Sequence, residues 1–241
     1  MARKPKRQRQ TPAPPAAPPP RGSSDRDKII DALMALLTEH SFTDIGLAEI
    51  AGRAGVKLSQ LRAEFGSPLA IFAAHVKDID RKVLEGGDAE ASDEEARDRL
   101  FDVLMRRLDA MAPYKEAVRS MLRSARRHPS LALALNAIAV RSQQWMLEAA
   151  GIKASGPKGM VRAQGAALMF ARVLAVWIDD EDESLDRTMA ALDRGLNSAE
   201  RWAGFLNDIC AVPKTLVRGA RGMRRRRRRP YDEGAAEADA A

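Results

Sequence analysis

Apolar residues recur every three or four positions along most of the chain, and no segment alternates apolar and polar residues as a β-strand does. This period is typical of amphipathic α-helices. The first such segment follows Ser24, which is suited to cap a helix, and ends near Leu37. The second has Thr43 and Asp44 as expected caps and ends at Gly55. With a third segment after Gly55, the pattern predicts three short helices in close succession.

The third segment has Leu58, Leu61 and Phe65 on one expected face. Ser67 and the proline after it predict the start of a fourth helix, which we expect to continue to Val83. Serine accepts hydrogen bonds from the free N–H groups of a first turn, and proline at the first helical position has no N–H to lose. A compact helical unit over residues 25–84 therefore follows from the pattern.

The next polar stretch, residues 86–92, contains two consecutive glycines and predicts a linker. Beyond it the helical period continues, with Pro113 and Pro129 at expected helix starts, a loop over residues 151–159, and Ser184 as the expected cap of the last long helix. This part of the chain therefore predicts a larger helical unit.

Charge divides the 241-residue chain differently from the helical pattern. The net charge of +7 comes from the ends, because residues 1–24 hold six basic and no acidic residues, and residues 212–241 hold nine basic and four acidic ones. The first segment is also rich in proline and alanine, which precludes regular structure. We expect an extended basic arm over residues 1–24, the larger helical unit over residues 92–206, and a basic, disordered tail over residues 207–241.

Several classes of protein are excluded or disfavoured by the sequence. A single cysteine, Cys210, rules out an internal disulfide and a cysteine-based zinc finger, and fits the cytoplasm. The three histidines, His40, His75 and His128, lack metal-ligand spacing, and His75 is expected at the surface. No phosphate-binding loop, nucleophile motif or uninterrupted apolar run of about 18 residues occurs. We therefore expect no enzyme activity, no cofactor and no membrane span.

Two short blocks carry a resemblance to a known family. Residues 50–56 read Ile-Ala-x-x-Ala-Gly-Val, residues 61–67 read Leu-x-x-x-Phe-Gly-Ser, and the apolar pair at 71–72 follows. In these features the segment 28–72 resembles the TetR-type DNA-binding domain. The resemblance implies an all-α fold with an N-terminal helix-turn-helix, whose third helix enters the major groove of double-stranded DNA. It also implies a one-component transcriptional regulator.

The resemblance implies a set of DNA contacts in which this chain departs from the family at four positions. The family often has serine or threonine at Lys57, threonine at Gln60, tyrosine at Arg62, and a phosphate-binding lysine at Pro68. Glutamine pairs with adenine and arginine with guanine through two hydrogen bonds each. The candidate DNA-contacting residues are Lys28, Thr43, Lys57, Ser59, Gln60 and Arg62. Residues 25–84 carry one more acidic than basic residue, so the basic ends of the chain are expected to supply attraction to phosphates.

TetR-like proteins also bind a small ligand in the second unit and pair through their last two long helices. By this resemblance a small apolar ligand is expected against Trp145, Met169, Phe170 and Trp177. A homodimer interface is expected along Leu185, Met189, Leu192 and Leu196. The alternative for both sets is that these apolar residues belong to the core of a single subunit.

The second unit is also similar to another family. Residues 145–151, 172–182 and 185–194 resemble the ubiquinone-biosynthesis accessory proteins, which have a TetR-like fold, bind lipid and have lost DNA binding. A terminal amphipathic helix over residues 205–217, followed by six arginines, would then bind an anionic membrane surface. Pro213 interrupts that helix. The sequence leaves this alternative open.

Overall fold

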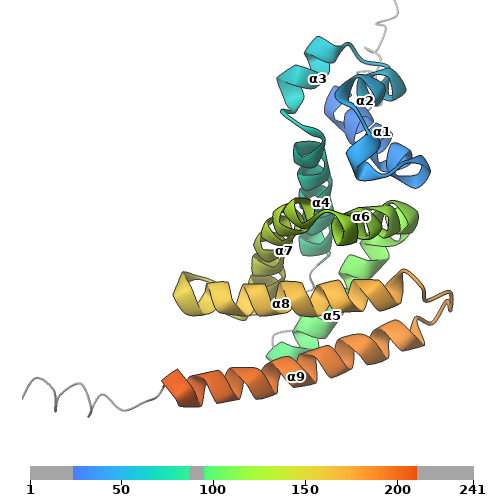
Figure 1. Ribbon diagram of the computed structural model, residues 1–241. Coiled ribbons are helices and arrows are strands. Elements are labelled where there is room, and N and C mark those ends of the chain that lie inside the picture. Colours follow the sequence, from blue (N-terminus) through green and yellow to red (C-terminus); the bar gives the residue numbers. More distant parts are fainter. Residues whose placement is uncertain (1–23, 87–94, 211–241) are drawn as a thin grey trace, which may run out of the picture.

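The computed structural model describes residues 24–86 and 95–210, and all regular structure in these residues is helical. The N-terminal helices are α1 (Asp25–Glu39), α2 (Leu47–Ala54), α3 (Leu58–Glu64) and α4 (Pro68–Glu85), with a 3₁₀ turn (Phe42–Asp44) between α1 and α2. The others are α5 (Ala96–Met111), a 3₁₀ turn (Ala112–Tyr114), α6 (Lys115–Arg127), α7 (Pro129–Ala149), α8 (Gly156–Trp177) and α9 (Asp186–Cys210). The predicted all-α fold is confirmed (Figure 1).

Two predicted helix starts are confirmed by their caps. The Ser24 hydroxyl accepts from the Asp27 N–H at 3.2 Å, and the Ser67 hydroxyl accepts from the Ala70 N–H at 3.1 Å. The start of α2 differs, because Thr43 and Asp44 lie in the preceding 3₁₀ turn. Gly46 is the N-cap residue instead and has no side chain to offer.

The helices enclose two apolar cores that meet along α4. The first lies among α1–α4 and also takes in Met121 of α6 and Leu131 of α7. The second lies among α4, α5, α7, α8 and α9. Ile71 and Phe72 near the start of α4 belong to the first core, whereas Ile79 and Val83 belong to the second. In Figure 1 α4 runs from the α1–α3 unit into the larger helical unit, so one continuous helix joins the two.

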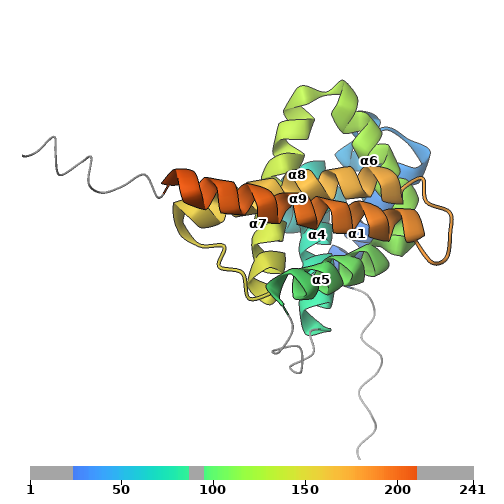
Figure 2. The ribbon, with the colours of Figure 1, turned by 90° about the horizontal axis from the view of Figure 1, so that it is seen from below.

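The last two helices, α8 and α9, lie side by side in both views (Figures 1 and 2). Gly195 of α9 permits their close approach, because a Cβ there would lie 2.7 Å from Cγ of Met169 on α8. Ser184 was predicted to cap α9, but the capping group is the Asp180 carboxylate. It accepts from the backbone N–H of Thr188 at 2.9 Å and from its hydroxyl at 2.6 Å, and these hydrogen bonds lower the pKa of Asp180.

Other predicted segments fall partly or wholly outside the described residues. These are the basic arm before Ser24, most of the linker, and the tail and terminal helix beyond Cys210. Within the described residues α8 is, by length and composition alone, apolar enough to cross a membrane, contrary to the expectation that no segment would qualify. Its packing against α7 and α9 identifies it as part of the helical unit.

Candidate nucleic-acid interface

The turn between α2 and α3 has the geometry that the sequence predicted. Gly55 adopts a left-handed conformation with φ of 66°, and the N–H of Val56 donates to the carbonyl of Ala51 at 3.1 Å. Ile50 and Leu61 are fully buried on the inner sides of α2 and α3. These contacts fix α3 against α1 and α2 and leave its outer face uncovered by the described chain.

All six candidate DNA-contacting residues are exposed. Lys57 is the N-cap of α3, and Ser59, Gln60 and Arg62 lie within that helix. Lys28 is brought near them through Asp25, which binds Lys28 Nζ at 3.3 Å and Gln60 Nε2 at 2.8 Å. Thr43 lies apart from this group in the 3₁₀ turn and donates to Asp44 at 3.4 Å.

Gln60 already has protein partners at both ends of its amide. Its Oε1 accepts from the backbone N–H of Lys57 at 2.8 Å, while its Nε2 donates to Asp25. The side chain therefore caps α3 and ties it to the start of α1. Pairing with adenine would require these two hydrogen bonds to be exchanged.

Leu58 is exposed in the structure, so its predicted place on the buried face of α3 is wrong. It was expected on the buried face with Leu61 and Phe65, but its side chain is 53% exposed. α3 has only seven residues, and its first turn projects beyond the core that covers Leu61. An exposed leucine beside Lys57 and Ser59 is suited to contact the methyl group of thymine. Periodicity alone gives no signal for this, because it groups Leu58 with the other apolar residues.

The cationic residues on α1, α2 and α3 differ in whether they already have acidic partners. Arg53 of α2 forms two contacts with Glu39, at 2.8 and 2.6 Å, and Lys28 pairs with Asp25. Within the described residues no ion pair of 4.0 Å or less involves Lys57 or Arg62. These two cations are therefore the ones on α3 available to an anionic partner.

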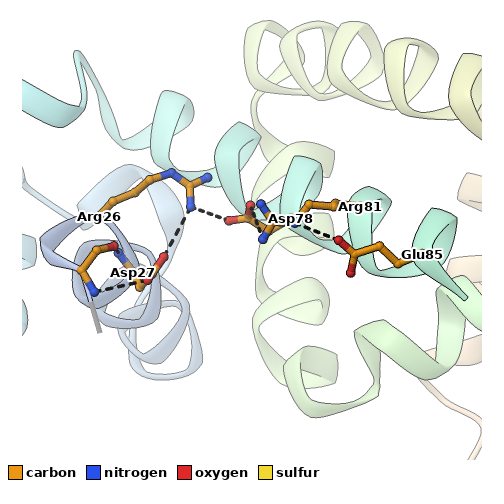
Figure 3. Close-up of polar contacts among 6 residues, drawn as sticks. Arg26, Asp27, Asp78, Arg81 and Glu85 are labelled. Carbon is orange, nitrogen blue, oxygen red and sulfur yellow. Dashed lines mark hydrogen bonds and ion pairs between the residues drawn. The ribbon is translucent and has the colours of Figure 1, made fainter. Parts of the chain in front are cut away.

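An ion pair fixes the helix-turn-helix to α4. Arg26 of α1 binds Asp78 of α4 at 2.8 Å, and Asp78 also lies 3.5 Å from Arg81 (Figure 3). The hydrogen bond to Asp78 raises the pKa of Arg26. Arg81 lies 3.7 Å from Glu85 one turn further along the helix. These contacts therefore join α4 to α1, the helix whose Asp25 contacts α3.

A second connection runs through α6. The Ser120 hydroxyl donates to the carbonyl of His40 at 3.1 Å, and the Ser124 hydroxyl accepts from the N–H of Phe42 at 3.2 Å. Both partners lie in the link between α1 and α2, so α6 holds that link in place.

His75 was expected at the surface but is only 6% exposed. Its ring stacks edge-on against Tyr114 with the centroids 4.4 Å apart. Burial lowers the pKa of His75 to about 4. It also raises the pKa of Tyr114, as do the nearby carboxylates of Asp31 and Asp78. The junction of α1, α4 and the turn before α6 thus contains a neutral histidine and a neutral tyrosine.

The structure does not bring the four predicted ligand-pocket residues together. Met169, Phe170 and Trp177 are buried in the second core, whereas Trp145 is 57% exposed on α7. Phe170 packs 5.6 Å from the guanidinium of Arg107. A surface depression of about 470 Å³, open to solvent, lies elsewhere, between α1 and the turn that joins α5 to α6. Met34, Thr38 and residues 112–117 are among those that line it.

The predicted dimer stripe on α9 is wrong for its central residues. Leu192 and Leu196 are 0% and 3% exposed and belong to the second core of the same subunit. Leu185 packs against that core, and Met189 is half-buried. α9 packs against α8 and α5, and Leu192 and Leu196 lie on the side of α9 that makes these contacts.

Comparisons with known proteins bear on the fold. No family model matches the chain, and no curated protein matches it. Among solved structures, a TetR transcriptional regulator from Nitrosomonas europaea is 25% identical, with a TM-score of 0.58 over 74% of this chain and 99% of that one. A TetR transcriptional regulator from Rhodococcus sp. RHA1 is 21% identical, with a TM-score of 0.48 over 73% and 94%. With the helix-turn-helix and the helical second unit, the first of these similarities establishes that the chain has a TetR-type fold.

Proposed function

We propose that this protein is a DNA-binding transcriptional regulator that acts in the cytoplasm as a homodimer. The observation that carries the proposal is the contrast between the two sides of α3. Its inner side is anchored by Leu61, whereas its outer side presents polar and cationic groups to solvent. A helix held in this way fits the major groove, and a two-fold dimer would read two half-sites about one helical turn or a small multiple apart.

The residues of α3 have distinct roles in this proposal. Arg62 pairs with a guanine edge and Leu58 contacts a thymine methyl group, while Lys57 binds a phosphate. Gln60 holds α3 against α1 in the free protein and exchanges its two hydrogen bonds for an adenine when bound. In this proposal Lys28 and Thr43 contact the phosphate backbone.

The proposal is tested by measuring binding to the fragment upstream of the protein's own gene and to an unrelated duplex, at physiological salt. Arg62→Ala combined with Gln60→Ala should abolish the preference for the specific fragment, because each bidentate contact contributes roughly 1–3 kcal/mol of discrimination. Arg141→Ala is the matched control, since Arg141 is an exposed arginine on α7, outside the helix-turn-helix. The control should bind as the unmodified protein does.

Two outcomes would contradict the proposal. Unchanged preference in the double variant would show that these are not the reading residues. If the unmodified protein has no preference for any fragment and binds anionic vesicles, the lipid-binding accessory function is the better explanation.

We further infer that a small ligand modulates DNA binding. The ligand is placed in the open depression between α1 and the α5–α6 turn, whose volume of about 470 Å³ is large enough to admit a small molecule. It is lined by α1, which carries Lys28 and Arg26, and by α6, whose Ser120 holds the α1–α2 link. Thr38→Trp should fill the depression and remove the response of DNA binding to any effector. DNA binding that still responds in this variant would contradict the inference.

A further inference from the structure

An acidic side chain, Asp25, connects the start of α1 to α3. Its two carboxylate oxygens have different partners. Oδ2 accepts from Gln60 Nε2 at 2.8 Å, and Oδ1 lies 3.3 Å from Lys28 Nζ, one turn further along α1. The side chains of Asp25 and Lys28 are 37% and 45% exposed. The carboxylate therefore lies at the surface, beside the outer side of α3.

The partners of Gln60 determine which way its side-chain amide points. A carboxylate can only accept hydrogen bonds, so the amide nitrogen must face Asp25. A backbone N–H can only donate, and the amide oxygen accepts from that of Lys57 at 2.8 Å. The amide cannot be turned over without the loss of both hydrogen bonds. Its orientation in the free protein is therefore set by Asp25 and Lys57.

The hydrogen bond to Asp25 is the stronger of the two, because its acceptor is charged. Charge-assisted hydrogen bonds are about twice as strong as those between neutral groups. In the proposed function Gln60 gives up both hydrogen bonds when it pairs with adenine through its amide nitrogen and oxygen. It then exchanges a charged acceptor for a neutral one, the N7 atom of adenine. This exchange offsets much of what the adenine contact contributes.

We propose that Asp25 is a specificity-determining residue, which suppresses the reading of adenine by Gln60. This inference rests on the proposed function and extends it to α1, since Asp25 acts through Gln60 and not on a base. Arg62 has no acidic partner within 4.0 Å in the described part of the chain. Discrimination should therefore be strong at the base that Arg62 contacts and weak at the base that Gln60 contacts.

Simple repulsion between Asp25 and DNA would have a different effect. A carboxylate close to phosphates lowers the affinity for every duplex alike, because phosphates carry no sequence information. The hydrogen bond to Gln60 acts at one base position only. Asp31 allows the two effects to be separated, because it is an exposed carboxylate on the same helix and Gln60 has its partners elsewhere.

The proposal is tested in the full chain with duplexes that carry each single-base variant of the fragment upstream of the protein's own gene. Asp25→Ala should gain a preference of about tenfold for adenine at one position, because Gln60 no longer gives up a charged acceptor. Asp25→Asn keeps a neutral acceptor and should gain less. Asp31→Ala, the matched control, should leave every base preference as it is.

Two further measurements make the test specific to the contact between Asp25 and Gln60. Asp25→Ala combined with Gln60→Ala should lose the new preference for adenine. Without DNA, the side-chain amide resonances of Gln60 in NMR spectra should shift in Asp25→Ala and stay in place in Asp31→Ala. The start of α1 should remain helical in these variants, because Ser24 and Asp27 cap each other's backbone N–H groups.

Several results would overturn the proposal. They are no new preference in Asp25→Ala, a new preference that persists without Gln60, the same preference in Asp31→Ala, or unshifted Gln60 resonances in Asp25→Ala. If the unmodified protein prefers its fragment and Asp25→Ala changes no base preference, only this inference fails and the proposed function stands. If the unmodified protein has no preference for its fragment, the proposed function fails and this inference fails with it.

Discussion

α3 and α8 each present one side that the described chain leaves uncovered, but the two sides differ in length and chemistry. α3 has seven residues, and its outer side holds Lys57, Ser59 and Arg62. α8 has 22 residues, and its outer side holds Val161 and Leu168. A short polar face suits a hydrated polyanion, whereas a long apolar face suits another helix. The two uncovered sides therefore suit partners of different chemistry.

The inner sides of the same helices are alike, since both are buried in apolar cores. Changes on the inner sides should therefore lower the stability of the subunit, and changes on the outer sides should weaken binding. The following predictions test this division, beginning with α4, which belongs to both cores.

The largest loss of stability is expected from Asp80→Ala. Asp80 is 7% exposed, pairs with the buried Arg107 and accepts from the Ser142 hydroxyl at 2.8 Å. Removing the carboxylate leaves a buried guanidinium without its charge partner, which typically costs about 3–5 kcal/mol. Urea denaturation should show this loss. Asp78→Ala, whose partner Arg26 is half-buried at the rim, should cost at most about 1 kcal/mol. Equal losses of stability in the two variants would contradict the assignment of Asp80 and Arg107 as an interior ion pair.

Leu192→Ala and Leu168→Ala should separate the inner from the outer side of the α8–α9 pair. Leu192 is fully buried, so its truncation should lower the free energy of unfolding by about 2–5 kcal/mol. Leu168 is half exposed, so its truncation should chiefly weaken the dimer. Denaturation at two protein concentrations distinguishes these effects, because only the Leu168 loss depends on concentration. A concentration-dependent loss for Leu192→Ala would contradict its place in the subunit core.

Acid should destabilise the fold through His75. Because burial lowers the pKa of His75 from 6.5 to about 4, the unfolded chain binds an additional proton between these pH values. The contribution of His75 to stability is complete above pH 6.5 and falls as the pH drops toward 4, by roughly 3 kcal/mol in all. His75→Phe should remove this part of the pH dependence, measured by denaturation at several pH values. An unchanged slope would show that other groups cause it.

The smallest effect is expected from Leu58→Ala on α3. Leu58 is 53% exposed, so stability should change by no more than about 0.5 kcal/mol. Discrimination in favour of thymine at one position should fall by roughly 1 kcal/mol, in a binding assay with single-base variants of the site. A large loss of stability with unchanged discrimination would assign Leu58 to the core, as its sequence spacing suggested.

The sequence predicted the helices and their turns because these depend on near neighbours. Ser67 caps α4 through a residue three positions away, and Gly55 turns the chain by its own backbone conformation. Periodicity also placed Leu192 and Leu196 on the apolar side of their helix, but it did not show which other helices that side contacts. The place of these residues, and of Leu58 and the exposed Trp145, follows from the tertiary packing of the helices.

Polar contacts between residues far apart in the sequence could not be predicted either. Gln60 was predicted to read a base, and its bond to Asp25, 35 residues away, was not foreseen. Arg107 and Asp80 are 27 residues apart and their buried pairing has no local signature. His75 was expected at the surface because histidine often lies there, and the contact with Tyr114 that buries it joins two distant segments.

The hydrogen bond between Gln60 and Asp25 has a practical consequence for handling the protein. It fixes Asp25, the first residue of α1, beside α3. A bulky group attached to the side chain at position 24 would therefore sit where nucleic acid is proposed to bind and would block it. A small fluorophore at the same place would instead report each binding event directly.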